Sequence, residues 1–231
     1  MTLLLALAVS MMLVTGAWAI PYSATKIIIE VNSTDGDAGI QIFLDGEGWS
    51  ELEITDPNGA EILDIEAEGS IGMQGITELF FESAEPSFDE QSLEELFELF
   101  PEGKYRFRGE TVDGQPLKGK ATLTHAIPAG PIILSPEEGE VVDPGDVVIF
   151  WDPITDPLPG TWVPVDIAGY QVIVEREEPT VLVFRVDLPA TAAQVTVPWE
   201  FLEAGTTYKV EVLAIEESGN QTITESEFET P

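Results

Sequence analysis

The sequence has no cysteine and a single histidine, His125. A chain without cysteine forms no disulfide and offers neither a thiol nucleophile nor a thiolate ligand for a metal. Any serine triad or histidine-based zinc site would depend on His125 alone. His125 ends a predicted strand just before a proline-rich segment, and we interpret it as a hydrogen-bonded structural residue. No Gly-x-Ser-x-Gly motif is present, which excludes the usual nucleophile elbow.

Basic side chains are also scarce, because 9 Lys and Arg stand against 43 Asp and Glu and give a formal net charge of −34. The acidity is spread evenly, since the segments before and from Pro131 carry −17 each. Such a field repels phosphate groups and anionic lipid, so we exclude nucleic acid and a membrane surface as partners. The plain interpretation is a solvated acidic surface.

The first residues form a short apolar run from Leu3 to Val14, below the ~20 residues that span a bilayer. Ala17-Trp18-Ala19 fits a small-x-small cleavage site. We therefore predict a signal peptide over residues 1–19 and a secreted or periplasmic protein that touches no membrane beyond that peptide. A basic segment before the run is missing, and an uncleaved anchor is the alternative interpretation.

Seven short apolar runs follow Pro131 at the spacing of sandwich strands. They are Ile132–Ser135, Val147–Trp151, Ile167–Glu175, Val181–Leu188, Gln194–Val197, Thr207–Glu216 and Gln221–Phe228. Tyr208, Val210 and Val212 share one strand face by the period of two. Tyr208 follows a turn at Gly205, and its hydroxyl is placed to bond back to that turn as a tyrosine corner. We expect Trp151, Tyr170, Leu202 and Tyr208 in the core.

These residues, in this order, resemble a fibronectin type III domain over about residues 131–230. The resemblance implies a β-sandwich fold and an extracellular compartment, but no activity, because such sandwiches serve many functions. The segment from Asp152 to Pro164 departs from the family by being longer and richer in proline.

The first domain has strand patterns and one helix. We predict strands at Lys26–Val31, Ile40–Leu44, Glu51–Thr55, Glu61–Ile65 and Ile76–Glu82, with the second ended by Asp45-Gly46. Ser92 and Glu95 form a capping-box pattern before a short helix that Pro101 stops. The order Gly103, Tyr105 and an alternating strand echoes Gly205 and Tyr208, so Tyr105 is a further core candidate.

We therefore predict an all-β protein of two tandem Ig-like or fibronectin type III-like sandwiches, the first with one short helix and only weakly similar to that family. The predicted domains span residues 20–127 and 132–231, and a stiff proline linker over residues 128–131 holds them in line.

Two loops predict a metal site. Asp35 and Asp37 alternate with small residues, and Asp45 and Glu47 lie one predicted strand away. If these loops meet at one end of the sandwich, four carboxylates provide the oxygen ligands that calcium prefers. The alternative is two ordinary turns rich in Asp and Gly. Calcium is the only cofactor that the pattern indicates.

Two further groups are candidates for binding. Five of the nine basic residues fall on one predicted hairpin, where they share the face opposite Tyr105: Lys104, Arg106, Arg108, Lys118 and Lys120. We favour cross-strand pairing with neighbouring Glu, with a docking patch for an acidic domain of another copy or an anionic polymer as the alternative. Trp49 and Trp162 lie in predicted loops, where tryptophan stacks on sugars or anchors an interface.

The sequence as a whole favours an exported, non-catalytic binding or interaction protein whose partner is an extracellular or periplasmic protein or glycan. The alternative is a carbohydrate-binding or carbohydrate-active protein, the latter using a glycosidase-type carboxylate pair.

Overall fold

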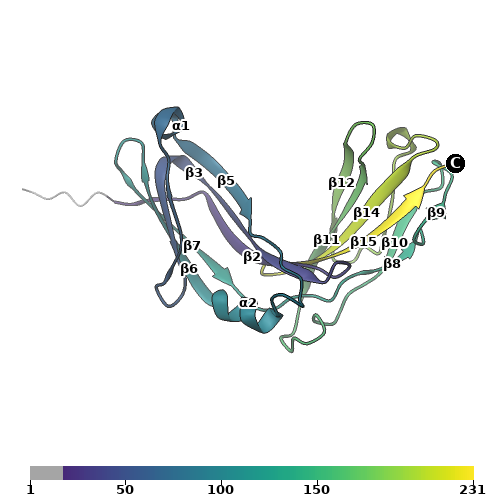
Figure 1. Cartoon of the computed structure of the whole chain (residues 1–231), viewed down its shortest axis with the longest axis horizontal. Coiled ribbons are helices and arrows are strands. Elements are labelled where there is room, and N and C mark those ends of the chain that lie inside the picture. The colour runs from purple at the N-terminus through teal and green to yellow at the C-terminus, as the bar shows by residue number, and fades with distance from the viewer. Residues whose placement is uncertain (1–17) are drawn as a thin grey trace, which may run out of the picture.

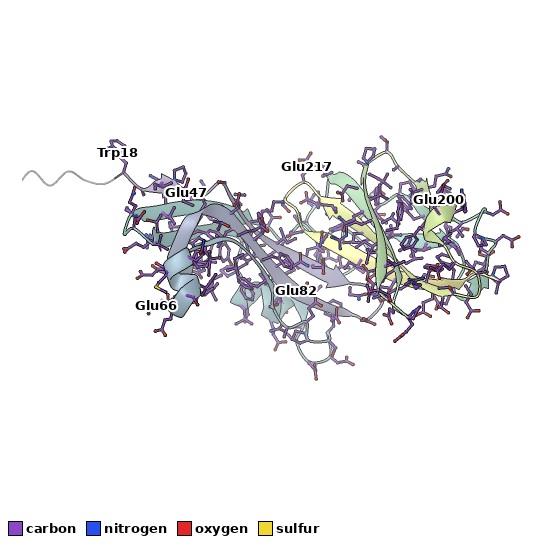
Figure 2. The ribbon with its side chains drawn as sticks, turned by 90° about the horizontal axis from the view of Figure 1, so that it is seen from above. Trp18, Glu47, Glu66, Glu82, Glu200 and Glu217 are labelled. Atoms are coloured by element: carbon purple, nitrogen blue, oxygen red, sulfur yellow. The ribbon has the colours of Figure 1, made fainter. Side chains whose placement is uncertain are left out.

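The computed structural model describes residues 18–231, and residues 1–17, which hold most of the predicted signal peptide, lie outside the described residues. Two strand-rich lobes meet at an angle and form a V (Figure 1). Carboxylates stand on both lobes, with Glu66 and Glu82 on one and Glu200 on the other (Figure 2). The predicted all-β class is confirmed. No helix within residues 18–231 is both long and apolar enough to cross a bilayer.

The N-terminal lobe consists mainly of strands. Its elements are β1 (Ile20–Pro21), β2 (Ala24–Asn32), β3 (Asp37–Thr55), β4 (Glu61–Glu66), α1 (Gly69–Gln74), β5 (Ile76–Glu82), α2 (Leu93–Leu99), β6 (Gly103–Thr111) and β7 (Pro116–Leu123). The first half of β3 pairs with β2 and β5, and its second half pairs with β4 and β6. A single strand therefore joins the strands of the lobe into one hydrogen-bonded sheet.

The prediction that a strand ends at Asp45-Gly46 was wrong, because β3 continues through both residues. A Cβ at position 46 would lie 2.7 Å from Cδ1 of Tyr22, so glycine is required there by close packing and not by a turn. The pairing registers shift between Asp45 and Trp49, where pairing with β2 has ended and pairing with β4 and β6 begins.

The capping box at α2 is confirmed. The Glu95 amide donates to the Ser92 hydroxyl at 3.3 Å, and the Ser92 amide donates to the Glu95 carboxylate at 2.9 Å. Beyond the helix, the Tyr105 hydroxyl donates to the Pro101 carbonyl at 3.0 Å. Helix α1 carries neither a side-chain cap nor a buried residue, which explains why no sequence signal marked it.

The strands of the C-terminal lobe form two sheets. Its elements are β8 (Ile132–Ser135), β9 (Glu140–Val141), β10 (Val148–Asp152), β11 (Ile167–Arg176), β12 (Leu182–Pro189), β13 (Gln194–Thr196), η1 (Trp199–Phe201), β14 (Thr207–Glu216) and β15 (Gln221–Glu229). One sheet has the order β13-β10-β8, and the other has the order β12-β11-β14-β15. The seven predicted strands are all present in these sheets.

Buried aromatic residues fill the space between the two C-terminal sheets. The ring centroids of Trp151 and Tyr170 are 5.3 Å apart, and Tyr208 stacks on Phe228 at 5.3 Å. The Tyr208 hydroxyl accepts a hydrogen bond from the Glu203 amide at 2.7 Å, which closes the tyrosine corner. The structure buries every predicted core residue: Trp151, Tyr170, Leu202, Tyr208 and Tyr105.

The lobes are joined by more than the linker. Strand β15 pairs with β2 in parallel, so one sheet runs through both lobes. The Asn220 side chain, 1% exposed, accepts from the Ile29 amide at 2.9 Å and donates to the carbonyls of Thr124 and Ala126. These bonds fix the lobes at the angle of the V, which corrects the expectation that they lie in line.

The proline-rich loop between β10 and β11 has a structural role that the sequence did not reveal. Leu158 of this loop is buried in the core of the N-terminal lobe together with Ile127. The Leu158 amide donates to the Ile127 carbonyl at 2.9 Å, and the Ala129 amide donates to the Asp156 backbone carbonyl at 3.0 Å. The length and proline content of the loop therefore serve the contact between the lobes.

Candidate functional site

The candidate site is the outer face of the sheet β4-β3-β6-β7, which we call the charged face. Leu52 and Ile54 of β3 and Tyr105 and Phe107 of β6 point inward and are buried. The residues between them point to solvent by the period of two. The face carries six carboxylates and five cations: Glu51, Glu53, Glu61, Asp64, Glu66 and Glu110, with Lys104, Arg106, Arg108, Lys118 and Lys120.

The strand register sorts these charges into two halves. Along one row the order is Asp64, Glu53, Arg108 and Lys118, so two carboxylates on β4 and β3 are followed by two cations on β6 and β7. The neighbouring row on one side contains Glu66, Glu51 and Glu110. The row on the other side contains Glu61, Thr55, Arg106 and Lys120. Apart from Glu110 on β6, the face is thus acidic toward β4 and basic toward β7.

None of the five cations on this face forms an ion pair with another residue in the described part of the chain. The ion pairs within residues 18–231 are Arg176–Glu203 at 2.6 Å, Lys209–Glu211 at 3.1 Å and Lys209–Glu225 at 2.9 Å. The predicted cross-strand pairing of the hairpin with neighbouring Glu is therefore not formed. Arg108 is in register with Glu53, but their charged groups do not come within 4.0 Å of each other.

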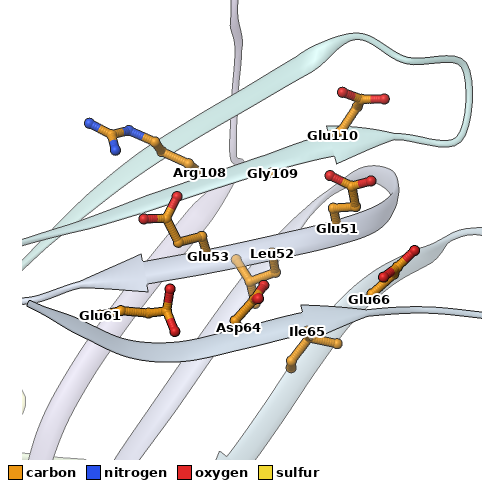
Figure 3. Close-up of a pocket in the computed structure, with 10 residues that line it drawn as sticks. All are labelled: Glu51, Leu52, Glu53, Glu61, Asp64, Ile65, Glu66, Arg108, Gly109 and Glu110. Atoms are coloured by element: carbon orange, nitrogen blue, oxygen red, sulfur yellow. The ribbon is translucent and has the colours of Figure 1, made fainter.

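A shallow hollow of about 410 Å³ lies on this face. Figure 3 shows its lining, with carboxylates from β3 and β4 surrounding it and Arg108 at one side. Most of the lining is charged: Glu51, Glu53, Glu61, Asp64, Glu66, Glu110 and Arg108. A hollow of this kind suits a charged side chain of a partner better than an apolar ligand.

The four predicted calcium ligands do not meet. Asp37 pairs with Asn32 at one end of the β2–β3 ladder, and Asp45 pairs with Ala24 at the other end. Eight residues of extended strand separate them by roughly 26 Å. Asp35 and Glu47 lie near these two ends, so one ion cannot contact both pairs, and the predicted four-carboxylate site is wrong. The cause is the continuous strand β3.

Other carboxylates gather at the junction of the lobes. Glu30, Glu82 and Glu85 place oxygen atoms within 4.8 Å of one another. Burial raises the pKa of Glu30 to about 7, against the opposing effect of a hydrogen bond from Gln221. Burial, followed by the charge of Asp35, also raises the pKa of Asp37. Calcium binding stays a prediction, which a melting comparison in calcium and in chelator would test.

The two tryptophan candidates differ in exposure. Trp49 is 0% exposed. It lies in β3, where it pairs with Ile76 of β5 and Thr111 of β6, so its proposed role in binding was wrong. Trp162 is 91% exposed on the loop between β10 and β11 and stays available to a ligand. His125 stacks on Phe97 at 3.9 Å, and its Nε2 lies 2.9 Å from the Phe100 carbonyl oxygen, in agreement with a structural role.

No protein-family model matches the chain, and a comparison with curated proteins gives no match. Among solved structures, the chain is similar to the FN1–FN3 domains of chicken CNTN1, with 10% identity, a TM-score of 0.35, and 91% of this chain and 68% of that chain covered. It is similar to a two-domain fibronectin type III segment of chicken tenascin, with 10% identity, a TM-score of 0.31, and 90% and 98% covered. It is also similar to a tetra-tandem repeat in the extending region of a large adhesion protein, with 12% identity, a TM-score of 0.29, and 88% of this chain and 48% of that chain covered.

Proposed function

We propose that the protein is an exported, non-catalytic interaction protein that presents the charged face to a partner outside the cytoplasm. The observation that carries this proposal is the set of five exposed cations that lack an ion pair within residues 18–231. On a chain with a net charge of −34, acidic groups are abundant, yet none within the described residues forms an ion pair with this hairpin.

The joining of the lobes supports the same function. Asn220, Leu158 and the β2–β15 pairing hold one lobe against the other, so the face is carried on a stiff body. A rigid surface loses little conformational entropy on binding, which favours affinity for a given set of contacts. Export rests on the apolar run and the Ala17-Trp18-Ala19 pattern, and N-terminal sequencing of the exported chain should begin at Ile20.

Retention on a resin that carries a sulfated polysaccharide tests the proposal. At about 150 mM salt the protein should be retained despite its net negative charge, because a Debye length of about 8 Å confines the interaction to the hairpin surface. The double variant Arg106→Glu with Lys120→Glu should elute without retention. The control Lys26→Glu with Arg185→Glu, which makes the same change in charge elsewhere, should remain bound. Elution of the wild-type chain without retention would overturn the proposal.

A second candidate function is carbohydrate binding, which the exposure of Trp162 favours. An exposed indole ring can stack on a sugar face. Trp162→Ala should then weaken retention on an immobilised neutral polysaccharide, and the charged-face variants should not. Equal retention of Trp162→Ala and wild type would remove this candidate.

A further inference from the structure

The charged face is close to neutral as a whole, in contrast to the rest of the molecule. Its six carboxylates and five cations nearly cancel, so almost all of the net charge of −34 lies elsewhere. Two copies of the chain therefore repel each other least when they approach through this face.

The arrangement of charges is also complementary to itself in two of the three charged rows of the face. Consider a two-fold axis that lies in the plane of the face and runs parallel to the strands, between β3 and β6. This axis places β4 of one copy over β7 of the other, and β3 over β6. In the row Asp64, Glu53, Arg108 and Lys118, each carboxylate then faces a cation of the other copy. In the row that contains Glu61 and Lys120, these two residues face each other, whereas in the third row Glu51 faces Glu110. A surface that fits its own two-fold copy is the requirement for an isologous dimer.

We propose that the charged face binds a second copy of this chain, with the acidic half of each copy against the basic half of the other. This inference rests on the proposed function and names its partner. The cations of the hairpin lack ion pairs within residues 18–231 because their counter-charges come from the other copy. The hollow beside Arg108 receives a long basic side chain of that copy.

The size and chemistry of the face set the strength of the association. Four strands are roughly 20 Å wide, so the contact is smaller than the ~800 Å² per partner of a standard interface. Exposed ion pairs contribute less than about 1 kcal/mol each and are screened by salt. The dimer is therefore weak and strongly dependent on salt.

Sedimentation equilibrium of residues 20–231, the chain expected after cleavage, tests the inference over a range of protein concentrations. The dimer should be populated at about 150 mM salt, where repulsion between the acidic remainders of the two copies is screened, and should dissociate at about 500 mM salt. Two reversed variants are needed: Arg108→Glu with Lys118→Glu, and Glu53→Lys with Asp64→Lys. Each variant alone should dimerise at least about tenfold more weakly, because like charges then face each other across the axis.

An equimolar mixture of the two variants gives the decisive result. Each reversed half then meets its complement, so the mixture should form a heterodimer while neither variant self-associates. The control Lys26→Glu with Arg185→Glu should dimerise like the wild type. A wild-type chain that stays monomeric at about 150 mM salt, or a mixture that fails to associate, would overturn the inference. Retention of a monomeric chain on the sulfated resin would leave the proposed function intact and assign the face to an anionic polymer.

Discussion

The two lobes have similar interior packing and differ in the ion pairs that their basic residues form. Each buries a tryptophan within a strand and closes a corner with a tyrosine hydroxyl. In the C-terminal lobe, two of the three basic residues, Arg176 and Lys209, are in ion pairs with glutamates, and Arg185 is not. In the N-terminal lobe the hairpin cations have no such partner within the described residues. The two lobes therefore share these packing features of the interior, whereas the distribution of surface charge distinguishes one lobe from the other.

The largest expected effects come from removing the two buried tryptophans, which tests whether the lobes are equally dependent on them. Trp49→Ala and Trp151→Ala should each lower the free energy of unfolding by about 3–5 kcal/mol, through lost burial and the cavity left behind. Hydrogen exchange during chemical unfolding should show the greater loss of protection in the lobe that carries the substitution. Trp162→Ala, at an exposed position, should change stability by less than about 0.5 kcal/mol. Equal loss of protection in both lobes would show that they unfold as one unit.

Much of the fold could be predicted because it depends on local sequence. The capping box at Ser92, the strands of the C-terminal lobe and the corner at Tyr208 follow from periodicity and turn residues. The continuity of β3 could not be predicted, because Gly46 is there to accommodate the ring of Tyr22, a contact with a distant strand. The same error placed Trp49 in a loop and brought Asp45 near Asp37.

Contacts between the lobes could also not be predicted from the sequence. Leu158 lies in a segment that reads as a loop, and its burial depends on the core of the other lobe. Asn220 follows a turn glycine and gave no sign of its four hydrogen bonds across the junction. For the candidate site, alternation correctly placed the five cations on one face. Their lack of ion pairs depends on side-chain geometry, which no periodicity encodes.

A smaller effect concerns Glu30, which lies where the two lobes meet and should make the stability of the fold depend on pH. Glu30 has a folded-state pKa of about 7, above its ordinary value of 4.5, because of burial. The folded state thus binds the proton more tightly, and the stability from this group is complete below about pH 4.5 and is lost as the pH rises through about 7. Glu30→Gln removes this titration, so the loss of stability between pH 5 and pH 8 should shrink by about 1–3 kcal/mol.

Thermal unfolding at both pH values measures that difference. Glu78→Gln changes an exposed carboxylate of β5 and serves as the matched control. It should keep the pH dependence of the wild type. An unchanged pH dependence in Glu30→Gln would show that the carboxyl of Glu30 gives up its proton at the same pH in the folded and unfolded states.

The smallest effect separates the two tyrosine corners, which look alike in sequence but use opposite hydrogen-bond roles. The Tyr208 hydroxyl accepts from the Glu203 amide, whereas the Tyr105 hydroxyl donates to the Pro101 carbonyl. An amide without an acceptor is less well tolerated than a carbonyl without a donor, because the carbonyl has two lone pairs and more ways to be satisfied. Tyr208→Phe should therefore cost about 1–2 kcal/mol and Tyr105→Phe about 0.5–1 kcal/mol. Chemical unfolding gives both values, and amide exchange at Glu203 should accelerate in Tyr208→Phe alone. Equal costs, with no change in exchange at Glu203, would mean that the direction of the hydrogen bond does not matter and that the two corners are equivalent.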